Sequence, residues 1–212
     1  MSRAAEAPLP SDRFEELLKA ASPAYGLELT QATLAGAGTY LESLDSWRRK
    51  TNLTGALSAQ ELAEHTLESM LGAGLIPQRS AVADVGSGAG FPGVPLAIYR
   101  PDLSVALVEP RHKRAAFLRH VARVVPLRNV AVYEARIESL DAEAFDAVAT
   151  RAVGALPEWL GDGSLVRPGG GLLAWTTEAD RMAEALLPRF RLETTLPIPG
   201  SRSRQIALFR RV

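Results

Sequence analysis

The sequence of 212 residues contains no cysteine. Disulfides, thiolate metal sites and every mechanism that depends on a cysteine nucleophile are therefore excluded. The chain also lacks a charge surplus, since 24 Lys and Arg residues balance 24 Asp and Glu residues. A nucleic-acid-binding domain usually carries an excess of basic residues, so the totals give no support to such a partner. Any basic surface on this protein must be local.

Long apolar runs are absent too. Residues 1–10 lack the basic start and apolar stretch of a secretion signal, and no segment approaches the roughly 20 apolar residues that span a bilayer. We therefore expect no membrane partner and a cytoplasmic location. With 47% apolar and 23% charged residues, the composition is that of an ordinary globular protein with one main core.

The spacing of apolar residues changes near residue 75. Before this point, apolar residues recur at spacings of three and four, which predicts helices. Ser58 followed by Glu61 is a capping-box pattern that marks the start of the third helix. After it, short apolar runs alternate with helical segments, which indicates an α/β domain with a mostly parallel, doubly wound sheet and an antiparallel terminal hairpin. We expect a helical segment over 1–75 that packs on an α/β domain over 76–212. The predicted helices are 11–21, 30–50, 58–71, 93–99, 113–124 and 178–187, and the predicted strands are 80–85, 104–108, 130–133, 145–150, 171–175, 190–197 and 205–210, with a turn at 167–170.

A glycine-rich segment joins the first predicted strand to the next helix. In Asp84–Gly90, DVGSGAG, the glycines let the backbone approach a ligand, and the following helix offers free N–H groups. A dinucleotide fingerprint would have its third glycine at the position of Phe91, so the spacing argues against NAD. The plain structural alternative is a tight turn without a ligand, in which Glu109 merely caps the following helix.

Acidic residues at two strand ends suit a cofactor with a cationic end and a ribose. Asp84 is placed to hold an amino group through ordered water, and Glu109, after the second strand, is placed to accept from both ribose hydroxyls. The aminoacyl and ribose ends of S-adenosylmethionine require these two charges. Past the third strand, the backbone at Ile137–Glu138 is a candidate for reading the adenine, and a surface turn is the alternative.

Missing groups narrow the choice of methyl acceptor. The Asn/Asp-Pro-Pro-aromatic loop typical of exocyclic-amine methylation does not follow the fourth strand, which runs into Arg151, and pyrimidine-carbon methylation would need a cysteine. Guanine N7 fits, because its lone pair is free at neutral pH and needs only a site that orients the ring. Arg151 is the candidate catalytic residue, since arginine pairs with the purine edge. A structural ion pair with Asp146 or Glu138 is the alternative.

Further motifs follow one another along the chain. They are Asp84–Ala97 with its Phe-Pro-Gly-x-Pro-Leu extension, Glu109 with Lys113-Arg114 and Phe117-Leu118, Arg136, and Thr150-Arg151-Ala152-Val153, preceded by Trp47, Asn52-Leu53-Thr54, His65 and Ser69. From about residue 47 onward, this set resembles the glucose-inhibited division protein B family. The resemblance implies a Rossmann-like class I methyltransferase that uses S-adenosylmethionine to methylate N7 of one guanine in the decoding-region loop of small-subunit (16S) rRNA. The expected partner is this rRNA or the assembling small subunit, and the expected state is a monomer.

The resemblance also implies roles for single positions. The cofactor set that we expect combines the family's positions with their loop neighbours, and no metal site is expected. It comprises Asp84, Gly86, Ser87, Gly88, Gly90, Phe91, Glu109, Ile137, Glu138 and Arg151. The RNA-facing cations of the family match Arg136, Arg151 and Arg204. Phosphate contacts at these cations would give salt-sensitive affinity, while a pocket near Arg151 reads the base.

Two departures from the family pattern leave other functions open. Glu68 stands where the family usually has Asp, and Thr176-Thr177 stands where it has Lys-Gly, which removes a possible lysine interaction with phosphate or acceptor. One alternative is a methyltransferase that acts on a small molecule or a protein. The other is an inactive paralogue that binds rRNA or S-adenosylmethionine without turnover. His65 is expected to be a structural residue of a buried helix face and not a metal ligand.

Overall fold

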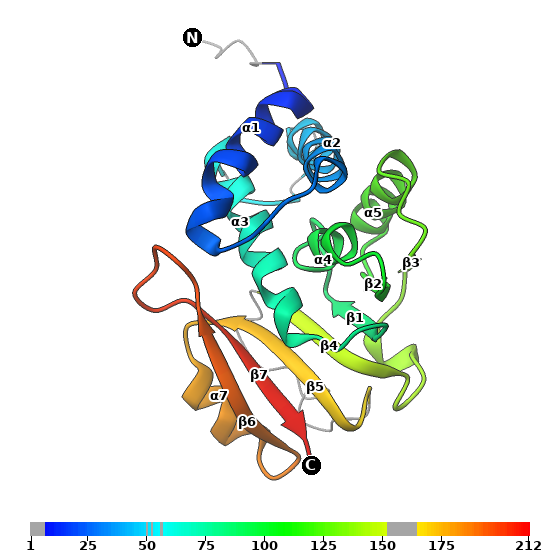
Figure 1. Ribbon diagram of the computed structural model, residues 1–212. Helices are drawn as coiled ribbons and strands as arrows, with labels where there is room; N and C mark the ends of the chain where they lie inside the picture. Colours follow the sequence, from blue (N-terminus) through cyan, green and yellow to red (C-terminus); the bar gives the residue numbers. More distant parts are fainter. Residues whose placement is uncertain (1–6, 50, 52, 56, 152–164) are drawn as a thin grey trace.

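A group of N-terminal helices packs above a seven-stranded sheet (Figure 1). The computed structural model describes residues 7–49, 51, 53–55, 57–151 and 165–212. Lys50, Asn52 and Ala152-Val153, which figure in the predicted helix end and motifs, lie outside the described residues. No helix of the described chain is long and apolar enough to cross a membrane.

The three predicted N-terminal helices are confirmed. They are α1 (Ser11–Ala21), α2 (Gln31–Arg48) and α3 (Ala59–Leu71). The capping box forms as expected, because the Ser58 hydroxyl accepts from the Glu61 N–H at 3.2 Å and the Glu61 carboxylate accepts from the Ser58 N–H at 2.7 Å. Short 3₁₀ helices that the apolar spacing did not predict follow α1 and α3, at Ser22–Tyr25 (η1) and Gly72–Leu75 (η2).

The sheet is mostly parallel, as predicted. Its strands are β1 (Ala81–Val85), β2 (Ser104–Val108), β3 (Val130–Tyr133), β4 (Phe145–Arg151), β5 (Val166–Thr176), β6 (Phe190–Pro197) and β7 (Gln205–Arg211). They lie in the order β3-β2-β1-β4-β5-β7-β6, with β7 antiparallel to both neighbours. The order reverses between β1 and β4, and open α/β sheets bind ligands at the carboxyl ends of the strands beside such a switch point.

Helices cover both faces of the sheet. They are α4 (Gly93–Tyr99), α5 (His112–Val124) and α7 (Ala179–Leu186), with a 3₁₀ turn η3 at Ile137–Ser139. Successive strand residues alternate between two cores, so that Leu107 packs with the N-terminal helices, α4 and α5, while Ala106 faces the core that includes α7. The first core holds residues from both sides of residue 75, and the proposed division at this point stays a prediction.

The prediction that residues 167–170 form a turn before a strand at 171–175 is wrong, because β5 already begins at Val166. Phe145 pairs with Val166 and Ala147 pairs with Gly171, so four residues bulge from β5 opposite Asp146. Gly169 adopts a φ of 74°, which glycine tolerates, and Arg167 reaches Asp146 at 2.9 Å. The turn residues therefore form a bulge inside a longer strand, and its partner strand holds both sides in the sheet.

Gly93→Ala is expected to lower the free energy of unfolding by about 1–3 kcal/mol, because the site is fully packed. A Cβ at Gly93 would lie 2.4 Å from Leu107 Cδ2 and 2.6 Å from Asp84 Oδ2. Gly74→Ala is the matched control, since nothing lies within 4 Å of its Cβ position. Denaturant unfolding of both variants measures the difference, and equal midpoints would show that the α4–β1 contact relaxes freely.

Candidate active site

The glycine-rich loop connects β1 to α4 at the carboxyl edge of the sheet. Gly86, Gly88 and Gly90 adopt φ values of 73°, 54° and 101°, which disfavour any larger residue. The N–H groups of Gly86 and Ser87 donate to the Val108 carbonyl at 2.9 and 3.1 Å, which ties the loop to β2. Nothing lies within 4 Å of a Cβ placed on Gly86, so this side of the loop is open to a ligand.

Tyr40 of α2 supports the loop from the side of the N-terminal helices. Its hydroxyl donates to the Ala89 carbonyl at 2.8 Å, and its ring meets Phe91 edge-on with centroids 5.6 Å apart. Burial raises the pKa of Tyr40, so the hydroxyl keeps the proton that it donates. The sequence reasoning missed this residue, because an apolar helix position 49 residues away carries no local signal of such a contact.

Asp84 has the properties of a buried cation receptor. Its Oδ2 accepts from the Gly93 N–H at 3.1 Å, whereas its buried Oδ1 has no hydrogen-bond partner among the described residues. Burial raises the pKa of Asp84 to about 7, and the Gly93 hydrogen bond opposes this shift. An unpaired buried acceptor is costly, so the carboxyl group fits an ammonium group at this place.

Glu109 lies after β2, with its carboxylate buried against the glycine loop. Oε2 accepts from the Gly88 N–H at 3.0 Å and Oε1 accepts from the Arg111 N–H at 2.9 Å. Because Arg111 directly precedes α5, the carboxylate does contact the helix start, as the structural alternative expected. A carboxylate has about four acceptor positions, so two remain for a pair of ribose hydroxyls. Both interpretations of Glu109 are therefore compatible with the structure.

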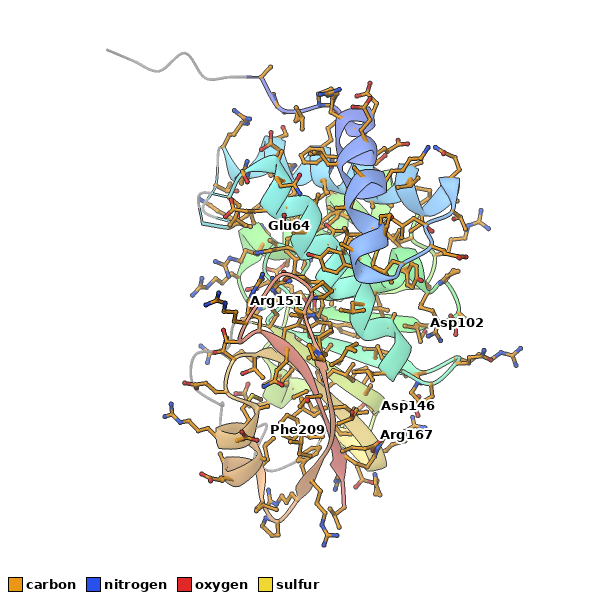
Figure 2. All side chains as sticks on the ribbon, turned by 60° about the vertical axis from the view of Figure 1, so that its left-hand side comes forward. Glu64, Asp102, Asp146, Arg151, Arg167 and Phe209 are labelled. Atoms are coloured by element: carbon orange, nitrogen blue, oxygen red, sulfur yellow. The ribbon has the colours of Figure 1, made fainter. Side chains whose placement is uncertain are left out.

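Arg151, at the end of β4, is held by α3. Its Nη2 lies 2.7 Å from Glu68 Oε2, and its Nη1 donates to the His65 carbonyl at 3.2 Å. The alternative ion pairs with Asp146 or Glu138 do not form, since Asp146 lies at the opposite end of β4 and binds Arg167 (Figure 2). The structural partner of Arg151 is thus Glu68, a residue that the sequence marked only as a departure from the family.

The same carboxylate brings Arg204 to the site. Arg204 Nη1 lies 2.5 Å from Glu68 Oε1, so one buried carboxylate holds two guanidinium groups. The Arg151 guanidinium also lies 5.8 Å from the centre of the Phe91 ring, beside the glycine loop. Arginine can pair with a purine edge or a phosphate, so an aromatic ring with two guanidinium groups beside it is an arrangement that can bind a nucleotide.

His65 packs its ring against Phe91, with centroids 5.9 Å apart. Burial, together with the nearby charges of Arg151 and Arg204, lowers the pKa of His65 to about 4. The ring is therefore neutral at pH 7. Within the described ranges, no group of three His, Asp or Glu side chains could hold a metal ion.

The remaining predicted residues lie at the other end of this edge. Ile137 is buried and Glu138 is exposed in η3, which begins four residues after the end of β3. Arg136 precedes them and is exposed. Because β2 and β1 separate β3 from β4, the structure brings Arg151 and Arg204 together but leaves Arg136 outside their cluster.

Strand order, a glycine loop after β1 and an acidic residue after β2 are together the features of the class I S-adenosylmethionine-dependent methyltransferase fold. A solved structure described as a SAM dependent methyltransferase from Aquifex aeolicus shares this fold, with a TM-score of 0.52 and 15% identity over 63% of this chain and 82% of that chain. S-adenosylmethionine is the cofactor of this class, and the open glycine loop and unpaired Asp84 oxygen fit it.

The chain belongs to the GidB family, rRNA small subunit methyltransferase G, whose model matches residues 34–185. A relative of this name from Halorhodospira halophila is 39% identical over 169 residues, covering 79% of this chain and 80% of the relative. Another, from Roseiflexus sp. (strain RS-1), is 42% identical over 151 residues and 66% of this chain. The matched segment spans 63% of the Roseiflexus relative, a little under two thirds of its length.

Proposed function

We propose that this protein transfers the methyl group of S-adenosylmethionine to N7 of a guanine in the decoding-region loop of small-subunit (16S) rRNA. The observation that carries the proposal is the cluster of Arg151, Arg204 and Phe91 beside the cofactor loop. The names of the relatives, which all denote a small-subunit rRNA methyltransferase, support the class of substrate.

In this proposal the cofactor lies along the carboxyl edge of β1, β2 and β3. The open backbone of the glycine loop, with Ser87 and Phe91, contacts its middle, Glu109 accepts from the ribose, and Asp84 takes the amino group. The backbone of Ile137 and Glu138 reads the adenine. When bound, S-adenosylmethionine supplies an electrophilic methyl group, and all further contributions come from residues that bind and orient.

Arg151 acts by positioning the acceptor. Its guanidinium group is fixed by Glu68 and by the His65 carbonyl, so little side-chain freedom remains to be lost when a purine binds. The group would pair with guanine O6 and leave N7 facing the methyl donor. No proton has to be removed from N7. The ring of His65, which packs on Phe91, is neutral and adds no charge that would repel the methylated product.

The partner that we propose is free small-subunit rRNA or the assembling small subunit. Exposed Arg136 and half-exposed Arg204 are proposed to contact its phosphates, from opposite ends of the carboxyl edge. The enzyme is proposed to act as a monomer in the cytoplasm.

Labelled methyl groups from S-adenosylmethionine are expected to enter small-subunit rRNA taken from a strain that lacks the modification. Nuclease digestion of the product should release the label as 7-methylguanine, and large-subunit rRNA from the same strain is the matched control. Label in another nucleoside would move the acceptor atom. Absence of label, despite measurable cofactor binding, would favour a small-molecule or protein substrate or an inactive paralogue.

A further inference from the structure

A cleft of about 650 Å³ lies between the end of α2 and the start of α5. Figure 1 shows the two helices close together, on the side of the molecule away from α7. Five Lys and Arg residues line the cleft, and no Asp or Glu is among its described lining residues. The five are Arg48 and Arg49 from the end of α2, and Arg111, Lys113 and Arg114 from the start of α5.

Neighbouring carboxylates neutralise only part of this charge. Asp45 lies 2.6 Å from Arg48 and 2.9 Å from Arg49, and Glu109 lies 4.0 Å from Arg114. Among the described residues, Arg111 and Lys113 form no ion pair, so these two cations of the cleft keep their charge uncompensated in a chain whose net charge is zero. The first turn of α5 adds the partial positive charge of a helix N-terminus. The local basic surface that an RNA-binding protein requires is therefore present in this cleft.

The cleft opens beside the cofactor loop. Arg114 Nη1 lies 3.6 Å from a Cβ placed on Gly88, and it approaches the ribose-side carboxylate of Glu109. Arg151 approaches the same loop at Phe91. The cleft and the Arg151–Arg204 pair therefore flank the glycine loop at two different places.

We propose that this cleft binds backbone phosphates of the RNA strand that carries the acceptor guanine. The inference rests on the proposed function and adds to it a second RNA-binding surface, built by the N-terminal helices together with α5. Arginine and lysine side chains that bind phosphate give affinity without reading sequence, and they release bound counterions. The contribution of the cleft should therefore appear as salt dependence of binding.

The test is the binding of unmodified small-subunit rRNA to the full chain at several salt concentrations. Arg111→Gln/Lys113→Gln removes two exposed cations of the cleft. For single-stranded RNA, the slope of log affinity against log salt should become shallower by roughly 0.7 for each phosphate-binding cation removed, about 1.4 in total. Arg111→Lys/Lys113→Arg should restore the slope, because it keeps both charges.

Arg181→Gln/Arg191→Gln is the matched control, since it removes two exposed arginines from α7 and β6, far from the cleft. We expect this pair to keep the slope of the unmodified protein, and both pairs to keep its affinity for S-adenosylmethionine. Equal slopes for the two glutamine pairs would overturn the proposal while leaving the proposed function intact. An unmodified chain that binds rRNA without salt dependence would overturn both. Binding with the expected slopes but without methyl transfer would support the cleft and contradict only the proposed activity.

Discussion

Arg151→Ala is expected to slow methyl transfer to small-subunit rRNA by about a hundredfold or more, because a misplaced acceptor loses the benefit of fixed orientation. The substitution also removes a cation from Glu68, whose side chain is 1% exposed and keeps only Arg204. Breaking a buried ion pair from one side costs about 3 kcal/mol. Single-turnover rates and denaturant unfolding of the same preparation measure the two effects.

The double variant Glu68→Gln/Arg151→Met separates catalysis from stability. Replacing both members of a buried pair with neutral groups of similar volume is often close to neutral. Arg204 also loses the Glu68 carboxylate, but its side chain is 41% exposed to water, so unfolding should return toward that of the unmodified protein. Methyl transfer should stay as slow as in Arg151→Ala, because no guanidinium group at position 151 faces the acceptor. A double variant that recovers both stability and rate would show that Arg151 serves the fold alone.

The affinity for S-adenosylmethionine is expected to rise with pH until about pH 7. Burial raises the pKa of Asp84 to about 7, and the cationic amino group binds the ionised carboxylate, so protons compete with the cofactor below this pH. The affinity should fall roughly tenfold for each pH unit below the pKa. Calorimetric titrations from about pH 5.5 to about pH 7.5 measure this affinity and keep the amino group of the cofactor protonated.

The raised pKa of Asp84 also predicts that the cofactor-free protein loses stability as pH rises from about 4 to about 7, because the folded state holds the proton more tightly than the unfolded state.

Asp84→Asn is the control for this pH dependence. The variant keeps the size of the side chain but removes the titrating charge, and it should bind the cofactor with a loss of about 2 kcal/mol, roughly thirtyfold, at neutral pH. The affinity of the variant for the cofactor should no longer change with pH over about one and a half pH units below the raised pKa that Asp84 has in the unmodified protein. A slope that persists in the variant would assign the titration to another group.

Local patterns predicted most of the elements, and pairing partners decided the rest. The strand-loop-helix unit from β1 to α4 follows from apolar spacing and glycines within one short stretch, and it is confirmed. The predicted start of β5 was wrong, because the residues of its bulge are of types that favour turns. Only the pairing of Phe145 with Val166 keeps them in the strand. The structural alternative for Arg151 named Asp146 or Glu138, whereas the observed partner Glu68 lies 83 residues away on a helix of the first segment.

By itself, the sequence determined the class of fold and the glycine loop between β1 and α4, because apolar spacing and glycines act on the backbone over a few residues. It also excluded cysteine chemistry outright. Tertiary structure alone decided which charges meet. Glu68 gathers Arg151 from the end of β4 and Arg204 from the residue before β7, and the end of α2 places Arg48 in one cleft with Lys113, although the whole chain has no net charge. Electrostatic interactions depend on distance in space, and a sum along the sequence does not contain that distance.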